Sequence, residues 1–319
     1  MKRMTVAICT YNRAERLQNL IEALRQQVCS IPFEILVVDN NSSDNTQIIL
    51  ASIGSTEGIP VRFVVEKRQG ITFARNRAIQ EAAHSQHLLF IDDDEWPLPG
   101  LVEAATQALE FDEAECVGGR IKCFFGNKSR PGWLRDDLLP FLGAVDYGSE
   151  SFWVVDETTP LWSGNIAYRT AIFKENPHFR FDHRYNRRGE GIGGGSDAIM
   201  FQEFLKAGVK MRYRPDMVLL HSIEESRLNR GYFLKRHFIS GQKYGQFQTG
   251  DYPRTIAGIP FFMFSQMMRQ CLSTFKLLVA RDPRVMRQAM NASYAMGSMY
   301  GRFLGWCWVP RRGRYNCVS

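Results

Sequence analysis

Short apolar segments alternate with helical patterns through the first half of the chain, and this alternation constrains the fold more than any other feature. The apolar segments cover residues 5–9, 33–38, 61–65 and 87–91. Between the first two, apolar side chains recur at helical spacing: Leu17, Leu20, Ile21 and Leu24. Residues 72–83 form another helical pattern, and Asn12 with Glu15 predicts a capping box before the first helix. Short apolar strands separated by helices are typical of a parallel sheet covered on both faces, so the sequence predicts an α/β fold.

Polar clusters follow three of these predicted strands at the point where each strand ends. They are Thr10-Tyr11-Asn12-Arg13, Asp39-Asn40-Asn41 and Asp92-Asp93-Asp94. In open α/β sheets, ligands bind beyond the carboxyl ends of the strands. The three clusters therefore indicate a nucleotide-binding site. A dinucleotide-dependent dehydrogenase is disfavoured, because no Gly-x-Gly-x-x-Gly motif follows the first strand.

The run Asp92-Asp93-Asp94 indicates a metal site. Three carboxylates at one strand end repel each other, and a bound cation would relieve that repulsion. Asp92 and Asp94 are on alternate residues, so they point the same way from an extended backbone and can hold one Mg²⁺ or Mn²⁺ with diphosphate oxygens. Such a metal would neutralise charge on a leaving nucleoside diphosphate. The alternative is a solvated acidic turn, but the buried strand before it favours the metal.

Two further side chains can meet a nucleotide. Asp39 closes the second strand, where a carboxylate can accept hydrogen bonds from a base or a ribose. Alternatively, it caps the following helix, a role that residues 42–44 also suit. Arg75 lies in an early turn of a predicted helix, near the end at which anions bind. Arg77 is better explained as an ordinary solvated arginine.

A glycine-rich segment over residues 189–195 leads into a predicted helix over residues 198–207. A carboxylate at the start of a helix, here Asp197, is oriented yet accessible and can act as a general base. In the alternative, Ser196 or Asp197 only caps the helix. His221 follows an apolar run, where a lone histidine is more often buried and hydrogen-bonded than a ligand.

Seven segments follow one another along residues 4–245: VAICTYNR, EILVVDNNSSDNT, QGITFARNRA, LLFIDDDEWPLPG, LWSGNIAYR, GGSDAIMFQEFLKAG and MRYRPDMVLLHS. In order and spacing they resemble family 2 glycosyltransferases of the GT-A fold. The resemblance implies a Rossmann-like, mostly parallel sheet flanked by helices. It also implies inverting transfer of a sugar from a nucleoside-diphosphate sugar, with a UDP-sugar as the expected donor.

Carried over residue by residue, the resemblance implies roles for individual side chains. The nucleotide would be contacted by Thr10, Tyr11, Arg13, Asp39, Arg75, Asp92 and Asp93. The metal ligands would be Asp92, Asp94 and His221, of which the first two form the family's DxD motif. Asp197 would be the catalytic base. The family usually has Glu-Asp where this chain has Ser196-Asp197, so the acidic neighbour of the base is missing, and Glu190 or Glu203 could substitute for it.

Charge divides the chain into two parts. The net charge is +7, but the segment from Ser226 onward has 15 lysines and arginines against two aspartates, a net +13, and the first 225 residues carry −6. A basic segment of this kind usually meets an anionic partner. We expect a catalytic domain over residues 1–225, with a nucleotide-binding half over 1–115 and an acceptor half over 116–225. A basic helical extension would cover residues 226–319.

The C-terminal extension is expected at a membrane surface. Residues 221–228 and 232–241 resemble the end of bacterial exopolysaccharide transferases that act on lipid-linked intermediates. The apolar stretch 256–268 falls short of the ~20 residues needed to span a bilayer, so a helix lying in the membrane plane is predicted. Its apolar face would present Met263, Met267, Cys271 and Leu278, with Gln270 off that face. In the alternative, these helices pack on the catalytic domain and the arginines are solvated.

Seven cysteines without a CxxC pair, and an N-terminus without a signal-peptide pattern, favour a cytoplasmic protein with reduced thiols. The expected partners are a nucleotide-sugar donor, a glycan or lipid-linked oligosaccharide acceptor, and the anionic inner face of the cell membrane; no nucleic acid is expected. The sequence thus predicts a metal-dependent hexosyltransferase of exopolysaccharide biosynthesis, peripheral on the membrane. The alternative is an inactive, nucleotide-sugar-binding subunit of a polysaccharide assembly complex. The presence of both Asp94 and Asp197 argues against it.

Overall fold

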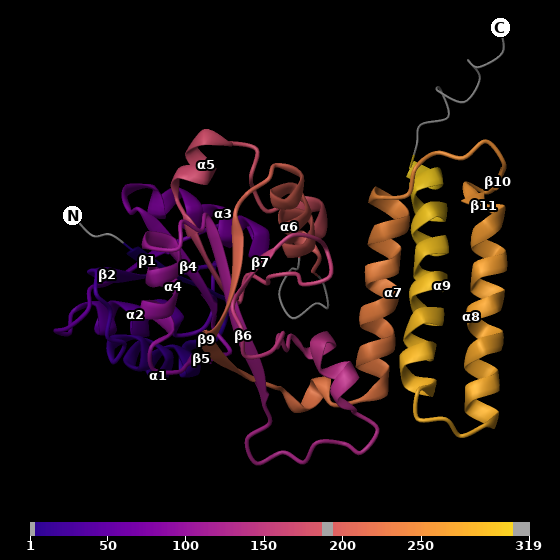
Figure 1. Ribbon diagram of the computed structural model, residues 1–319, viewed down its shortest axis with the longest axis horizontal. Helices are drawn as coiled ribbons and strands as arrows, with labels where there is room; N and C mark the ends of the chain where they lie inside the picture. Colours follow the sequence, from indigo (N-terminus) through magenta and orange to yellow (C-terminus); the bar gives the residue numbers. More distant parts are fainter. Residues whose placement is uncertain (1–3, 187–193, 309–319) are drawn as a thin grey trace, which may run out of the picture. The chain divides into compact units, whose positions relative to one another are not determined.

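One mixed sheet dominates the computed structural model, which describes residues 4–186 and 194–308 (Figure 1). Its strand order is β3-β2-β1-β4-β8-β6-β9-β5, and β7 pairs with β9. Strands β3, β2, β1 and β4 run parallel, whereas β8 is antiparallel to both β4 and β6. The strands are β1 Met4–Thr10, β2 Phe33–Asp39, β3 Val61–Val65, β4 His87–Asp92, β5 Glu95–Pro97, β6 Cys116–Phe124, β7 Phe152–Val154, β8 Asn165–Arg169 and β9 Met211–Ser222.

The register of the sheet aligns the C-terminal ends of three neighbouring strands. Thr10 of β1 is opposite Asp39 of β2, and Cys9 of β1 is opposite Asp92 of β4. The polar clusters that follow these strands therefore lie at the same end of the sheet. The four strands predicted from apolar runs are confirmed, each to within one residue at either end.

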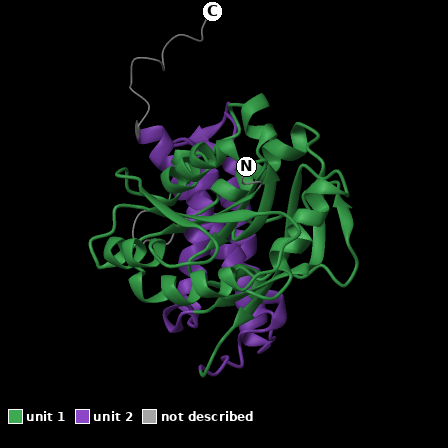
Figure 2. Ribbon diagram, turned by 90° about the vertical axis from the view of Figure 1, so that its left-hand side faces the viewer, with its two compact units in different colours: residues 1–127, 139–223 green, residues 128–138, 224–319 purple. Residues whose placement is uncertain are grey.

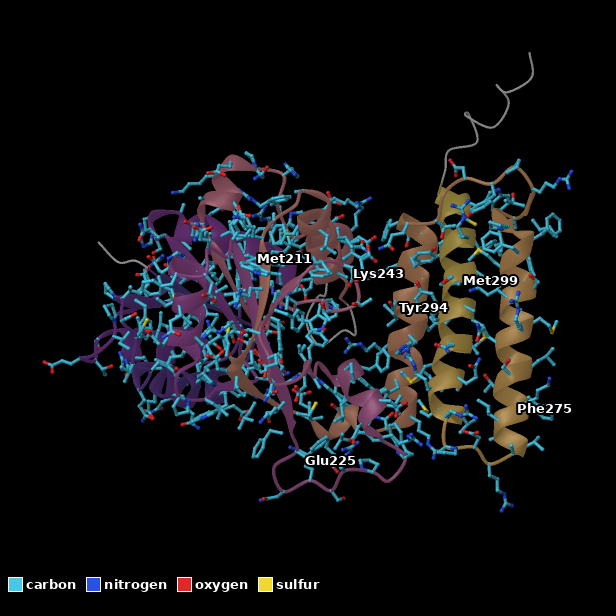
Figure 3. All side chains as sticks on the ribbon, in the orientation of Figure 1. Met211, Glu225, Lys243, Phe275, Tyr294 and Met299 are labelled. Carbon is cyan, nitrogen blue, oxygen red and sulfur yellow. The ribbon has the colours of Figure 1, made fainter. Side chains whose placement is uncertain are left out.

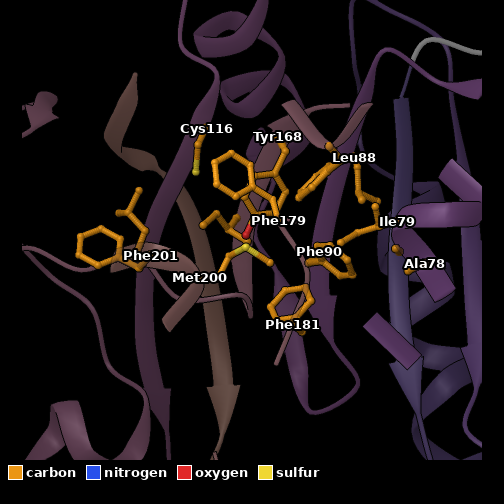
Figure 4. Packing of buried hydrophobic residues seen from close by; sticks show 14 of the residues in the cluster. Ala78, Ile79, Leu88, Phe90, Cys116, Tyr168, Phe179, Phe181, Met200 and Phe201 are labelled. Atoms are coloured by element: carbon orange, nitrogen blue, oxygen red, sulfur yellow. The ribbon is translucent and has the colours of Figure 1, made fainter. Parts of the chain in front are cut away.

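Helices cover both faces of the sheet and explain why β1, β2 and β4 are buried almost throughout. They are α1 Ala14–Arg25, α2 Thr46–Gly54, α3 Ile71–Glu81, α4 Leu101–Glu110, α5 Ala171–Glu175 and α6 Ser196–Lys206. Along β1, Ile8 belongs to one core with Leu17 of α1, while the next residue, Cys9, belongs to the other core with Ala74 of α3. Figure 4 shows part of this second core, in which aromatic rings from β4, β8 and the segment after α5 gather.

The predicted capping box at the start of α1 is wrong. Helix α1 begins at Ala14, and Arg13 occupies the N-cap position without a side-chain hydrogen bond. Asn12 has a φ of 52°, in the left-handed region, and its Oδ1 accepts a hydrogen bond from the Ser43 backbone N–H at 2.8 Å. Asp44 supplies the missing acceptor, because its Oδ2 lies 3.3 Å from the Ala14 nitrogen. The loop after β2 therefore caps α1, which a local sequence motif cannot show.

Two compact units divide the chain (Figure 2). The first contains residues 1–127 and 139–223, and the second contains residues 128–138 and 224–319. The division falls two residues before the boundary expected from the charge pattern, and it adds a short segment from the first half of the chain to the second unit. Within the first unit, one sheet continues across residues 115 and 116, because β6 pairs with β8 and β8 pairs with β4.

Three long helices form most of the second unit: α7 Arg230–Phe247, α8 Phe261–Val279 and α9 Val285–Trp308 (Figure 1). A small hairpin, β10 Thr255–Ile256 with β11 Ile259–Pro260, precedes α8. Across the described ranges 4–186 and 194–308, no helix combines the length and hydrophobicity needed to cross a membrane.

Glycines let α7 and α9 cross at backbone contact. A Cβ atom on Gly241 or Gly245 of α7 would lie 2.1 Å or 2.0 Å from a carbonyl oxygen of α9. The reverse holds for Gly297 and Gly301 of α9, where a Cβ would lie 2.0 Å from carbonyl oxygens of α7. Because no methyl group fits at these distances, the two GxxxG segments determine how closely the helices approach.

We expect Gly297→Ala to destabilise the helical unit, and Gly305→Ala in the same helix to leave it unchanged or slightly more stable. Both changes add the same helix-forming methyl group, worth about 1 kcal/mol, but only the first meets backbone. Forced overpacking costs about 1–3 kcal/mol. Thermal unfolding followed by circular dichroism measures the difference. Equal stability of the two variants would contradict close contact between α7 and α9.

The apolar face predicted for α8 is wrong in part. Met263 is only 4% exposed, and Gln270, expected on the solvent side, accepts a hydrogen bond from Gln288 of α9 at 2.5 Å. Phe275 instead projects from α8 into solvent, on the side away from α9 (Figure 3). The polar residue Gln270 packs against α9 because Gln288 satisfies its side chain there. The hydrophobicity pattern of α8 alone therefore predicts the wrong buried side.

Candidate active site

A buried arginine joins the end of β4 to the start of α6. Arg75 of α3 donates from Nη2 to Asp92 Oδ1 at 2.9 Å and from Nη1 to Asp197 Oδ1 at 2.6 Å. Its side chain is 7% exposed, and its guanidinium lies 5.4 Å from the centre of the Phe181 ring. Burial by itself would lower the pKa of Arg75, but the Asp197 and Asp92 carboxylates outweigh burial and raise it. Arg75 therefore remains charged and holds two carboxylates together that are far apart in sequence.

The start of α3 is fixed by two asparagines, and this fixes Arg75. Asn40, which follows β2, accepts from the Gly70 backbone N–H at 2.6 Å and donates to the Arg68 carbonyl at 2.8 Å. Gly70 has a φ of 135° and contacts Asn186 so closely that a Cβ there would lie 1.8 Å from the Asn186 Nδ2 atom. Only glycine fits this position. Asn186 has no local sequence signal for such a role, because its partners precede it by more than 110 residues.

Acidic side chains crowd the end of β4. Asp93 is half-buried and accepts a hydrogen bond from Thr10 Oγ1 at 2.7 Å. Burial, followed by the neighbouring Asp94 and Asp92 carboxylates, raises the pKa of Asp93 to about 7. Glu95 is 6% exposed and accepts from the Asp92 backbone N–H at 3.0 Å, and burial also raises its pKa well above the usual value. The cluster thus concentrates negative charge that a cation would stabilise.

Asp94 and His221, both predicted as metal ligands, lie side by side. The His221 Nε2 atom is 3.4 Å from Asp94 Oδ2, and the two side chains are 10% and 13% exposed. Strand pairing places His221 of β9 opposite Glu95 of β5. Gly143, with a φ of 98°, approaches the other ring nitrogen, and a Cβ there would lie 2.9 Å from Nδ1.

The third predicted ligand, Asp92, is held by Arg75 and not by this pair. Among residues 4–186 and 194–308, no three His, Cys, Asp or Glu side chains are grouped closely enough to hold a metal. The chemistry of the site nevertheless fits a divalent cation. Carboxylate oxygens with one imidazole suit Mn²⁺ or Mg²⁺, and the Asp94 carboxylate lies beside the His221 imidazole at this point.

The remaining predicted nucleotide residues lie at the ends of β1 and β2. Tyr11 and Arg13 are half-buried. The positive charge of Arg13 partly opposes the rise in the pKa of Asp93, so this arginine lies near the acidic cluster. Asp39 is fully buried, and it accepts hydrogen bonds from the Ser42 backbone N–H at 3.0 Å and from Gln47 Nε2 at 2.8 Å. Asp39 therefore orders the loop after β2 and does not cap α2, whose N-cap position belongs to Asn45.

Asp197 lies in the first turn of α6, but it does not cap that helix. Gly195 occupies the N-cap position, without a side-chain hydrogen bond. The Asp197 Oδ1 atom accepts from both Arg75 and Ser196, the latter at 3.3 Å, and the side chain is 27% exposed. Within the described residues, no hydrogen bond reaches Oδ2. The carboxylate is thus oriented through one oxygen and partly open to solvent, as a general base requires.

Glu203, one of the two residues considered as substitutes for a second acid, is nearer the other end of α6 and pairs with Lys206 at 2.8 Å. Glu190 lies outside the described residues. Arg77, expected to be an ordinary surface arginine, pairs with Glu81 one turn along α3 at 2.8 Å.

We expect Arg75→Ala to lower the free energy of unfolding by about 1–3 kcal/mol, because it removes a buried guanidinium and leaves Asp92 and Asp197, which are 37% and 27% exposed, without their shared partner. Arg77→Ala, two residues along the same helix, removes a pair with a side chain 37% exposed and should cost less than about 1 kcal/mol. Urea denaturation of both variants measures the contrast. Similar losses in the two would show that Arg75 does not hold Asp92 and Asp197 in place.

Comparison with known proteins gives one family for this arrangement. The family described as Glycosyl transferase family 2 matches residues 5–177. An uncharacterized glycosyltransferase, YfnE of Bacillus subtilis, is 35% identical over 116 residues, which cover 36% of this chain and 29% of that protein. The uncharacterized glycosyltransferase YibD of Escherichia coli is 25% identical over 335 aligned residues, covering 95% of this chain and 87% of the relative. A GalNAc(5)-diNAcBac-PP-undecaprenol beta-1,3-glucosyltransferase of Campylobacter jejuni is 26% identical over 131 residues, 41% of this chain and 42% of that one.

Solved structures of glycosyltransferases share the fold. The mannosyltransferase PcManGT of Pyrobaculum calidifontis, in complex with GDP-Man and Mn²⁺, superposes with a TM-score of 0.59 at 16% identity, over 94% of this chain and 86% of that chain. TarS 1-349 of S. aureus, in complex with UDP-GlcNAc, gives a TM-score of 0.54 at 15% identity, over 93% and 90% of the two chains. At these identities the likeness concerns the fold alone. It confirms the predicted GT-A architecture with a helical C-terminal extension.

Proposed function

Because the chain belongs to glycosyl transferase family 2, we propose that it moves a hexose, with inversion, from a nucleoside-diphosphate sugar to a glycan acceptor. Glycosyltransferase activity follows from the family; the donor, the acceptor and the stereochemistry are the proposal. The observation that carries it is the position of Arg75, which joins Asp197 to Asp92 at the end of the sheet. The proposed base and the proposed donor site are thereby parts of one site.

In the proposed reaction an acceptor hydroxyl attacks the anomeric carbon opposite the leaving group. The new glycosidic C–O bond forms while the bond between the anomeric carbon and the phosphate oxygen breaks, and the nucleoside diphosphate departs with the electron pair. Asp197 accepts the hydroxyl proton at its carboxylate. Arg75 donates a hydrogen bond to Asp197 Oδ1, which orients the carboxylate and leaves Oδ2 to take the proton.

A divalent cation would be held by Asp94 and His221, the pair that the fold brings together, with Asp92 as the second acid of the DxD motif. When bound, Mg²⁺ or Mn²⁺ supplies positive charge against the developing charge of the diphosphate. The Mn²⁺ bound together with GDP-Man in the PcManGT complex supports this assignment. At the ends of β1 and β2, Thr10, Tyr11, Arg13 and Asp39 are the proposed contacts of the nucleoside, with Asp93 held by Thr10.

A UDP-sugar is the proposed donor, supported by the UDP-GlcNAc complex of TarS. The proposed acceptor is a lipid-linked intermediate of an exopolysaccharide, supported by the Campylobacter jejuni relative, whose name specifies an undecaprenol-linked substrate. Such an acceptor would place the enzyme in the cytoplasm, peripheral on the inner face of the cell membrane. The net +13 of the segment from Ser226 onward suits the anionic headgroups there.

A donor panel tests the proposal. Purified protein is incubated with UDP-, GDP- and other nucleotide-sugars, with Mn²⁺ or with EDTA, and release of the nucleoside diphosphate is followed. We expect release from one donor class, and only with the metal present. Binding of a nucleotide-sugar without any turnover, with or without membrane lipids, would instead favour a catalytically inactive binding subunit.

A further inference from the structure

The outer side of α8 carries an apolar stripe that no part of the proposed chemistry uses. We propose that this stripe, which we call the α8 outer face, is the surface through which the protein binds an anionic lipid bilayer. Its members are between 54% and 68% exposed: Phe261, Met268, Leu272, Phe275, Leu278 and Val279. Most follow each other at intervals of three, four or seven residues, which places them along one side of a helix.

Packing within the second unit determines which way this face points. The opposite side of α8 carries the buried Met263, and Gln270 there accepts a hydrogen bond from Gln288 of α9. The α8 outer face is therefore the side of the helix that remains after α8 has packed on α9 (Figure 3). Single exposed apolar residues are ordinary, but a continuous stripe with two phenylalanines marks a site of interaction.

Charge identifies the partner. Helix α8 contains no acidic residue, and its two charged side chains, Arg269 and Lys276, are both exposed and lie seven residues apart beside the stripe. An apolar face bordered by basic residues is the pattern of a helix that lies in the interfacial plane of a membrane. Basic residues near an anionic bilayer each add attraction of their own. The face thus matches both the acyl region and the headgroups of such a bilayer.

A second copy of the chain is a poorer partner for the same face. In an antiparallel pair of two α8 outer faces, the Arg269 and Lys276 side chains of both copies would lie along the same edge of the contact, where like charges disfavour association. No acid on α8 could compensate them. An anionic surface has no such conflict, so the charge of the helix favours lipid.

The α8 outer face would be the surface that holds the protein at its proposed membrane location. This role rests on the proposed function only for the reason that the enzyme needs a membrane, because vesicle binding can be measured without any sugar transfer.

The test compares matched variants of the full-length chain in co-sedimentation with phosphatidylcholine vesicles, prepared with and without phosphatidylglycerol. Leu272→Ser with Phe275→Ser should lower partitioning to the anionic vesicles by about tenfold or more, because two inserting side chains are lost. The control is Ile48→Ser with Phe111→Ser, which removes side chains 70% and 76% exposed in the first unit and should bind as the wild type does.

A second variant tests the charges beside the stripe. Arg269→Gln with Lys276→Gln should lower binding to the anionic vesicles roughly tenfold and leave binding to the neutral vesicles unchanged.

Three outcomes would overturn the inference: a wild type that stays soluble beside anionic vesicles at low salt, a Leu272/Phe275 variant that binds as tightly as the wild type, or a wild-type dimer that this variant abolishes. The last outcome would make the face a contact between copies. Release of nucleoside diphosphate from the donor, measured without vesicles, should be equal in all variants. If no variant and no wild type releases it while vesicle binding follows the expected pattern, the proposed chemistry fails and the membrane surface stands.

Discussion

Asp197→Asn should reduce sugar transfer by roughly 10²–10⁴-fold and leave donor affinity almost unchanged. Asparagine keeps the size of the side chain, and its oxygen can still accept a hydrogen bond from Arg75. Arg75 can therefore still link residue 197 to Asp92. What the amide cannot do is accept the proton of the attacking hydroxyl. Turnover under saturating donor, together with donor affinity from calorimetry, measures the two effects separately.

The control for this substitution is Glu203→Gln in the same helix. Glu203 is 44% exposed and pairs with Lys206, so its neutralisation should affect neither turnover nor affinity. Thermal unfolding of Asp197→Asn must resemble that of the wild type for the comparison to hold. Turnover near the wild-type rate in a well-folded Asp197→Asn variant would move the base to another carboxylate.

Asp94→Ala should weaken donor binding in Mn²⁺ by about tenfold to a hundredfold, and should abolish the difference between Mn²⁺ and EDTA. The reason is that Asp94 and His221 are the adjacent side chains proposed to hold the metal against the diphosphate. His221→Ala should produce the same loss. If both hold one ion, the double variant is little worse than either single variant, because effects of residues that act as a unit are not additive.

Asp216→Ala serves as the control for the metal variants. Asp216 is on β9 with His221, but its side chain is 54% exposed and it pairs with Arg214 at the surface. Its loss should leave the response to Mn²⁺ unchanged. Donor binding that is equally tight in EDTA and in Mn²⁺ for the wild-type protein would exclude the metal role of Asp94 and His221.

The four parallel strands β1, β2, β3 and β4 were predictable because their signals are local. Each strand is a short apolar run, and each run ends at a polar residue such as Asp39 or Asp92. Parallel neighbours then bring those ends to one side of the sheet, as the pairing of Thr10 with Asp39 shows. The grouping of candidate residues at the end of the sheet therefore followed from periodicity and from a general property of α/β folds.

The contacts of Arg75 were not predictable, because they depend on residues distant in sequence. The sequence shows only an arginine in the early part of a helix, which suggests an anion. The fold instead brings Asp197, 122 residues away, to within 2.6 Å of its guanidinium. Two other contacts were not predicted for the same reason, namely the capping of α1 by Asp44 and the hydrogen bond between Gln288 and Gln270. In each, the partner lies on another element of the fold.

The stereochemistry of the reaction tests the central claim most directly. Wild-type protein is supplied with Mn²⁺, an α-linked donor from the active class and an acceptor, and the anomeric proton of the first-formed product is followed by NMR. Direct attack of the acceptor hydroxyl, with Asp197 as base, predicts a β-linked product from the start of the reaction. A first-formed α-linked product would contradict the in-line attack and the role of Asp197 as the base that makes it possible.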